Sequence, residues 1–242
     1  MKPPEFVSAS DGPAQRLGAV HYFHSVTREV ADELGLDLFR FYFCGRGGVL
    51  GDVDSSVVQS AFGYFNPQLL HKMWTTGGER CPVTEAAAAQ MSVAYRIGEE
   101  ALGALSGLGE AADHLARITS EVDASALALF AGFRSLPVPS SDPARFMHQV
   151  VLLRELRGSV HLAALAATGC PTREAHQLKR PGDGEMFGWT DVIEVSEADR
   201  DAFARANELT DLAMEHHVAV LSDEERSLVL AALEQAEQQL SS

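Results

Sequence analysis

Apolar residues recur at intervals of three and four positions along most of the chain, which is the spacing of one face of an α-helix. Near the start this pattern runs over 13–34, and Gly35 follows it as a helix stop. In the second half it runs over 144–169, where ARFMHQVVLLRELRGSVHLAALAATG is apolar on most sides and ends at Gly169. The pattern predicts an all-α, multi-helix protein with minimal β content.

Capping residues and helix breakers place the remaining helices. The expected starts and spans, in chain order, are Asp54 or Ser55, Asn66-Pro67, Thr84, 110–120, 124–134, Ser141 or Asp142, TREAHQLKR at 172–180, Ser196 to about Val220, and Ser222 with Glu225. A strand is expected only at Val192 to Val195, within the loop PGDGEMFGWTDVIEV.

Breaks in the pattern suggest a division of the chain. Residues 1–12 are rich in Pro and Ser without a periodic apolar pattern, so a disordered lead-in is expected there. The segment LPVPSSDP at 136–143 is the clearest linker, and it separates a helical half at 13–135 from a second half at 142–242. We expect two degenerate winged-helix-like halves packed together, and a homodimer formed through the long terminal helices.

Charge and composition argue against several classes of protein. The 19 basic and 34 acidic residues give a formal charge of −15, which repels nucleic acid and makes such a partner unexpected. No apolar run approaches the ~20 residues that span a bilayer, and the N-terminus lacks the apolar stretch of a secretory signal. A cytoplasmic protein without a membrane partner is therefore expected, with its 3 cysteines as reduced thiols.

The stretch FRFYFCGRGGVLGDV combines aromatic residues with a glycine cluster that holds a single arginine, Arg46. Glycines let the backbone turn sharply and approach a ligand, so Arg46 is a candidate clamp for a carboxylate or phosphate. Tyr42 lies beside it in the sequence. The alternative is a buried turn in which the arginine caps the end of a helix through carbonyl groups.

A second polar group interrupts the apolar segment 144–169. Arg154, Arg157 and His161 step by three and four residues, so they project from one side of a helix. Buried arginines need anions nearby, and Glu155 or Asp52 are the protein carboxylates that we consider for this role.

We expect both groups to line one pocket between the two halves. The predicted ligand-binding residues are Arg46, Arg154, Arg157, Tyr42 and Trp189, and the predicted catalytic residues are His161 and Asp52. In this hypothesis His161 acts as a general acid or base while the arginines hold an anionic substrate. The alternative is an internal Arg/Asp/His network that fixes how the halves dock.

Histidines offer another site. His21 and His24 lie three residues apart within the first predicted helix, and with His71 and His148 they are candidates for a haem or metal protein. No partner ligand stands at motif spacing, so no metal site is assigned. The sequence also lacks GxSxG, HExxH, Walker A and dinucleotide motifs, and it indicates no cofactor.

The segment 161–180 contains a helix, a turn at 169–171 and a second helix, which is the order of a helix-turn-helix. With YF…VADELGL…FCGRGGVLGDV…VVQSAFGYFNP, LRELRGSVHLAALAATG and FGW, the chain resembles, over about 21–215, a large group of mostly actinobacterial helix-turn-helix, loosely MarR-like proteins. The residues that carry the resemblance are Arg46, Leu50, Gly51, Arg154, Arg157, Gly158 and His161. The chain departs from the group's pattern at Val49, where proline is usual, at Ser159, where aspartate is usual, and in a shorter wing.

These observations leave three functions. The first is a small-molecule-binding protein or enzyme of specialised metabolism, with an anionic or polar organic ligand in the Arg/His/Asp pocket. The second, which the resemblance implies, is a MarR-like transcriptional regulator. The third is a haem or metal protein.

Overall fold

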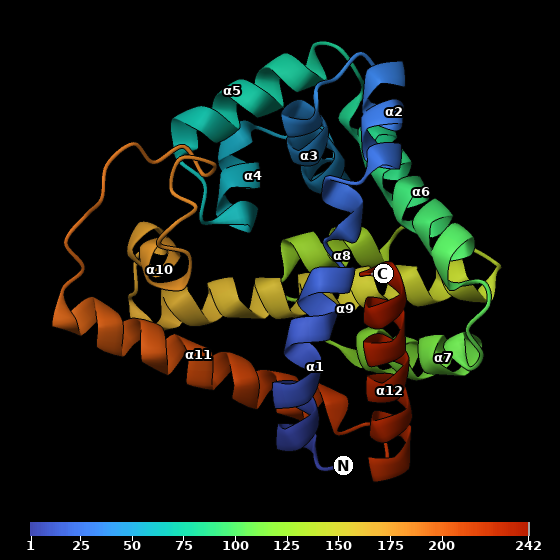
Figure 1. Ribbon diagram of the computed structural model, residues 1–242. Coiled ribbons are helices and arrows are strands. Elements are labelled where there is room, and N and C mark those ends of the chain that lie inside the picture. Colours follow the sequence, from blue (N-terminus) through green and yellow to red (C-terminus); the bar gives the residue numbers. More distant parts are fainter. Residues whose placement is uncertain (242) are drawn as a thin grey trace.

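The computed structural model describes residues 1–241, and within them helices are the only regular secondary structure (Figure 1). The elements are α1 (Pro3–Leu17), η1 (Val20–Tyr22), α2 (Ser25–Glu33), α3 (Leu38–Gly47), η2 (Gly48–Leu50), α4 (Ser55–Phe62), α5 (Pro67–Gly78), α6 (Val83–Leu102), α7 (Leu108–Glu121), α8 (Ala128–Arg134), α9 (Asp142–Thr168), α10 (Thr172–Lys179), α11 (Glu197–Val218) and α12 (Asp223–Leu240), where η marks a short 3₁₀ helix. The all-α prediction is confirmed.

Helix α9 is the central element of the fold. It is 27 residues long, and α1, α6, α7, α8 and α11 all pack against it. In Figure 1 it crosses the middle of the molecule, with α2 to α6 mainly above it and α7, α11 and α12 mainly below. Because neighbours surround it, apolar residues occupy most of its faces, and a few buried polar residues such as Glu155 lie among them.

One apolar core runs through both expected halves of the chain. It includes Phe41 of α3, Leu115 of α7, Leu156 of α9 and Leu233 of α12. The segment 136–143 joins α8 to α9, and these two helices pack directly on each other. The Pro- and Ser-rich composition of 136–143 therefore corresponds to a turn between two packed helices. The hydrophobic core is continuous on both sides of this segment.

The N-terminal residues expected to be disordered form most of α1. Pro3 stands at the first helical position, and Phe6 and Val7 are buried in the main core. The polar residues of this segment hid a short apolar stripe that continues through Ala14 and Leu17. Burial of that stripe orders the segment.

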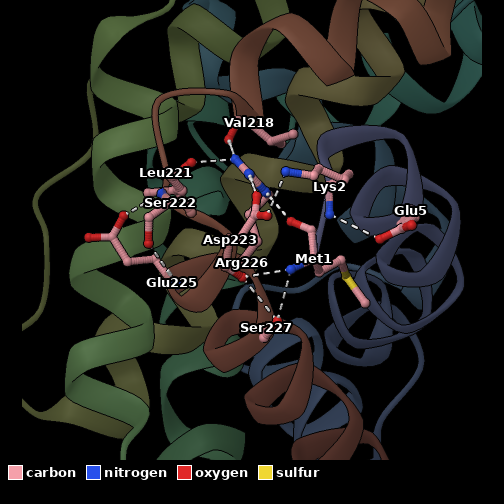
Figure 2. Close-up of polar contacts among 10 residues, drawn as sticks. All are labelled: Met1, Lys2, Glu5, Val218, Leu221, Ser222, Asp223, Glu225, Arg226 and Ser227. Atoms are coloured by element: carbon pink, nitrogen blue, oxygen red, sulfur yellow. Dashed lines mark hydrogen bonds and ion pairs between the residues drawn. The ribbon is translucent and has the colours of Figure 1, made fainter.

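Polar contacts also fix the chain's first residue (Figure 2). The amino group of Met1 donates to the carbonyl of Asp223 at 3.0 Å, and Arg226 Nε donates to the carbonyl of Met1 at 2.9 Å. Lys2 Nζ lies 2.9 Å from Asp223 Oδ2. The start of α1 is therefore attached to the start of α12.

The helix predicted over 13–34 is broken into α1, η1 and α2. The break begins at Gly18, where an added Cβ would lie 2.7 Å from Cδ of Arg154. The close approach of α1 to α9 therefore requires glycine at this position. His21 and His24 consequently do not share a helix face, because His21 lies in η1 and His24 is the N-cap of α2.

The strand predicted at Val192 to Val195 is also absent from the described residues. Gln177 of α10 takes the place of a neighbouring strand, since its amide donates to the carbonyl of Ile193 at 2.7 Å and accepts from the N–H of Ile193 at 3.0 Å. A side chain thus satisfies the backbone groups that a sheet would have paired. Separately, no helix in residues 1–241 is long and apolar enough to cross a membrane.

Replacing His21 with leucine is expected to make the protein less sensitive to acid. His21 is fully buried, neither ring nitrogen has a hydrogen-bond partner within residues 1–241, and burial lowers its pKa to about 3. The unfolded chain binds a proton at His21 below about pH 6.5 while the folded chain stays neutral, so stability is lost as the pH falls. Urea unfolding at pH 7 and pH 5 should show a loss smaller by about 1–2 kcal/mol in His21→Leu than in the wild type.

The control is His216→Leu, which changes an exposed histidine of α11. It should keep the wild-type difference between the two pH values. An unchanged difference in His21→Leu would contradict the prediction.

Candidate functional site

A cavity of about 430 Å³ opens between α1, α3, α9, α10 and the segments that follow α4 and α10. Eight aromatic residues line it, namely Tyr22, Phe23, Phe39, Tyr42, Phe62, Tyr64, Phe65 and Phe187. Six cationic residues line it, namely Arg16, Arg46, Arg154, Arg157, Lys179 and Arg180. Asp11 is the one acidic residue among the described residues that line it.

The structure brings five of the seven predicted site residues to this cavity. They are Tyr42, Arg46, Arg154, Arg157 and His161. The last three form the polar stripe of α9, which faces the cavity, as their spacing of three and four residues indicated. Their roles in binding or catalysis stay predictions.

Glu155 holds the two arginines at the inner end of the cavity. Arg46 Nη2 donates to Glu155 Oε2 at 2.8 Å, Arg46 Nε donates to Oε1 at 3.3 Å, and Arg154 Nη1 donates to Oε1. The Tyr22 hydroxyl donates to the same Oε1 at 3.2 Å. Of the two carboxylates considered from the sequence, Glu155 is the one that neutralises these arginines.

Burial and charge act in opposite directions on Glu155. Its side chain is completely buried, which by itself disfavours the carboxylate, but Arg46 and Arg154 outweigh this effect and lower its pKa to about 2. The group formed by these three residues carries a net charge of +1. It therefore leaves one positive charge for an anion in the cavity.

Arg46 reaches this position from a helix rather than from a glycine loop. It lies in the last turn of α3, and the glycines beside it allow α3 to pack closely on its neighbours. A Cβ at Gly45 would lie 2.8 Å from the side chain of Gln90, and one at Gly47 would lie 2.9 Å from Trp74. The glycine cluster thus serves helix packing rather than a sharp turn, and the role of Arg46 as a clamp for an anion stays a prediction.

His161 lies at the other end of the cavity and is held from two sides. Its Nε2 is 2.7 Å from the Tyr64 hydroxyl, and its Nδ1 is 3.1 Å from the Thr210 hydroxyl on α11. Burial lowers the pKa of His161 to about 4. The imidazole is therefore neutral near pH 7.

Lys179 and Arg157 complete the charge distribution between the two ends. Arg157 Nε pairs with Asp11 at 2.6 Å and its Nη2 pairs with Asp211 at 2.8 Å, so its charge is compensated. Lys179 is exposed at the rim and makes no ion pair or hydrogen bond with any described residue. Burial lowers the pKa of Lys179 and the nearby Asp11 partly offsets this, so Lys179 is a second positive charge that no ion pair within residues 1–241 neutralises.

Asp52 and Trp189 lie outside this cavity. Asp52 is exposed in a separate hollow with His71 and Trp74, so the prediction that it shares a site with His161 is wrong. Trp189 does not line the cavity, but it contacts a residue that does, since its indole N–H donates to the carbonyl of Tyr64 at 2.9 Å. Asp52 and Trp189 lie away from the site because of the course of the backbone, which cannot be read from the residue types alone.

The four histidines considered for haem or metal have other environments. No group of three or more His, Cys, Asp or Glu side chains in residues 1–241 is arranged to hold a metal ion. His24 Nδ1 accepts from the backbone of Val26, and His71 Nδ1 is 2.9 Å from the Ser55 hydroxyl. His148 is buried beside Tyr95, which is 2.7 Å from its Nδ1, and burial lowers the pKa of His148 to about 4.

Sequence reasoning missed Tyr64, Tyr22 and Lys179. Tyr64 follows the cap of α4 in the run AFGYFNP, and Tyr22 precedes α2, so neither belongs to a polar pattern. Lys179 lies in the second helix of the helix-turn-helix segment, where its residue type alone does not indicate a ligand site. The one available signal was the density of aromatic residues near Arg46, which does mark this wall of the cavity.

The second helix of the helix-turn-helix segment is covered by the chain that follows it. Arg173 pairs with Asp191 at 2.7 Å and stacks on Trp189, while Gln177 binds both backbone groups of Ile193. In Figure 1 this segment curves from α10 past α4 and returns to α11. Arg173 and Gln177, two of the polar side chains that a recognition helix would offer to DNA, are therefore engaged within the chain.

Comparison with known proteins gives one match. The model of a family described as "Helix-turn-helix family" matches residues 12–191, which is more than half of the chain. No curated protein and no solved structure matches the chain.

Replacing Glu155 with glutamine is expected to lower the unfolding free energy by roughly 3–5 kcal/mol, because two largely buried arginines lose their countercharge. Urea unfolding at pH 7 measures this loss. In the wild type the contribution of Glu155 is present above about pH 4.5 and is lost as the pH falls toward its folded pKa of about 2.

Glu208→Gln is the matched control, because Glu208 pairs with Arg205 at 2.8 Å on the exposed surface of α11. It should cost at most about 1 kcal/mol. Equal losses in the two variants would show that the buried carboxylate does not hold the arginines together.

Proposed function

We propose that this chain, which belongs to the helix-turn-helix family, binds a small organic anion with an aromatic body in the cavity beside α9. The observation that carries the proposal is the local reversal of charge. The protein as a whole has a formal charge of −15, yet six cationic residues and one acidic residue line this cavity. Such a site attracts an anion to a protein that otherwise repels it.

The balance of ion pairs supports an anionic ligand in particular. Glu155 neutralises only one of the two arginines that it contacts, and Lys179 forms no ion pair within residues 1–241, although burial lowers its pKa and the nearby Asp11 partly offsets this. Arg46 and Arg154 are partly buried, where positive charge that is not fully balanced is costly, and a carboxylate or a similar group on a ligand removes that cost. Arginine at such a position also offers paired donors that match the geometry of a carboxylate.

The aromatic wall supports a ligand with a flat apolar body. Phe62 lies under the guanidinium of Arg46 at 4.5 Å, and Phe65 stacks on Phe187 at 4.3 Å. Phe23 and Met186 line the cavity and are exposed, although both are large and apolar. A cavity of about 430 Å³ lies within the usual range for sites that hold metabolite-sized molecules.

Catalysis at the same site is a second candidate, favoured by the contact between Tyr64 and His161. The neutral His161 accepts a hydrogen bond at Nε2, so proton transfer to a substrate would pass through the Tyr64 hydroxyl. This candidate shares the anion-binding arginines with the first. It differs only in requiring turnover of the bound molecule.

An anionic dye provides a direct test of the proposal. The naphthalene dye 1-anilinonaphthalene-8-sulfonate should bind the folded protein, and the uncharged naphthalene dye Prodan should bind more weakly. Lys179→Glu should weaken binding of the anionic dye by roughly tenfold, because it replaces an uncompensated positive charge with a negative one. Fluorescence titration measures both affinities.

Lys72→Glu makes the same change of charge on the exposed surface of α5, away from the residues that line the cavity. It should leave the affinity for the anionic dye nearly unchanged. Equal weakening by both variants, or equal binding of the two dyes, would contradict the proposal.

Duplex DNA provides the test of the regulator. We expect no binding of a random-sequence duplex at about 50 mM salt, a low concentration at which contacts to DNA phosphates are strong. Fluorescence anisotropy of a labelled duplex measures this. Binding that falls steeply with added salt would favour the regulator, and the covering of α10 would then have to open.

A further inference from the structure

We infer that Tyr64 selects organic anions that carry a hydrogen-bond donor, a hydroxyl or amino group, at the end opposite their acidic group. The inference rests on the proposed function and narrows the class of ligand. It depends on the direction of one proton. The Tyr64 hydroxyl is already committed as a donor to His161, so only its oxygen lone pairs are free.

Thr210 sets the state of the imidazole. Its hydroxyl donates to the carbonyl of Ala206 at 2.7 Å, the usual contact of a helical threonine with the preceding turn. The single hydroxyl proton is used there, so Thr210 can only accept from His161 Nδ1 at 3.1 Å. His161 therefore carries its proton on Nδ1 and presents a lone pair at Nε2.

The lone pair on Nε2 then fixes the direction of the Tyr64 proton. Tyr64 Oη is 2.7 Å from Nε2, and with the proton of His161 on Nδ1 the tyrosine must donate. The lowered pKa of His161 keeps this arrangement down to about pH 4. Within residues 1–241 the Tyr64 hydroxyl has no other hydrogen-bond partner. A ligand group that donates a hydrogen bond can pair with the free lone pairs of the Tyr64 oxygen. A ligand group that only accepts would place its own lone pairs against those of Tyr64, which is unfavourable.

The backbone of Tyr64 is fixed independently of His161. Gly63 has a positive φ of 72° as it ends α4, and an added Cβ there would lie 2.4 Å from Leu162. Trp189 donates to the carbonyl of Tyr64 at 2.9 Å. Tyr64 is thus attached to α9 on one side and to the segment after α10 on the other.

Helix α9 sets the distance between the two ends of the ligand. Arg154 and His161 are seven residues apart on it, and a rise of 1.5 Å per residue separates their backbones by about 10.5 Å. This is close to the length of two linked aromatic rings with a substituent at each end. The structure therefore points to an aromatic carboxylate of about that length with a terminal hydroxyl or amino group.

The experiment compares three probes by isothermal titration calorimetry with the full chain. They are 4′-hydroxybiphenyl-4-carboxylate, its 4′-methoxy counterpart, which accepts but cannot donate, and uncharged 4-phenylphenol. The hydroxyl acid should bind roughly threefold to tenfold more tightly than the methoxy acid, the effect of one net hydrogen bond. It should also bind more tightly than 4-phenylphenol, which lacks the acidic group.

The variants distinguish selection by Tyr64 from a general change in the cavity. Tyr64→Phe should bring the ratio of the two acids close to one. His161→Phe frees the tyrosine proton, so binding of the methoxy acid should improve relative to the hydroxyl acid. A purely structural role of His161 would weaken both acids equally. Thr210→Val removes the acceptor of the Nδ1 proton and should reduce the ratio in the same direction, which provides a second variant if His161→Phe does not fold.

Each outcome has a distinct meaning. A ratio that persists in Tyr64→Phe, or that is near one in the wild type, overturns the inference and leaves anion binding intact. Failure of both acids to bind while the anionic naphthalene dye binds overturns it as well, because the length taken from α9 is then wrong. Equal binding of the hydroxyl acid and 4-phenylphenol contradicts the proposed function itself.

Discussion

The buried carboxylate of Glu155 is the interaction on which the rest of the structure depends. It lies on the central helix α9 with no exposed side-chain surface, and it holds Arg46 of α3 and Arg154 of its own helix. A carboxylate in that position is tolerated only because two cations and the Tyr22 hydroxyl surround it. The same contacts join α3 and η1 to α9 and leave one positive charge at the end of the cavity. The observed ion-pair network consists of Arg46, Arg154 and Glu155 rather than of the Arg, Asp and His side chains considered from the sequence, and its two arginines form part of the cavity wall.

The central position of α9 explains why stability and the site share residues. A helix surrounded by other helices has little freedom to carry polar groups, and its stripe from Arg154 to His161 is the side left open by the surrounding helices. Each member of the stripe is held by another element, which fixes its geometry. Arg157 is held by α1 and α11, and His161 is held by Tyr64 and Thr210. Such support from several elements keeps the side chains of a binding site in place.

Membership of the helix-turn-helix family does not by itself assign a DNA-binding role, because function belongs to sites rather than to folds. Here the second helix of the motif has 8 residues, and the segment after it engages Arg173 and Gln177. The end of that helix instead contributes Lys179 to the cavity. The helix-turn-helix elements thus form part of the wall of the candidate ligand site.

The sequence by itself determined the helical class, most helix starts and the polar stripe of α9, because capping and apolar periodicity are local properties. Asp54, Asn66, Ser196 and Ser222 cap helices as their residue types indicated. Only the tertiary structure decided that residues 3–17 are helical, that one core crosses the linker, and that Tyr64 rather than Asp52 meets His161. Those outcomes depend on contacts between residues far apart in the sequence, such as Tyr64 and His161, which are 97 positions apart, and on glycines whose role is close packing. Residue type and spacing indicate the secondary structure that a segment prefers. Which other segment it packs against depends on the apolar surfaces that are buried together in the folded chain.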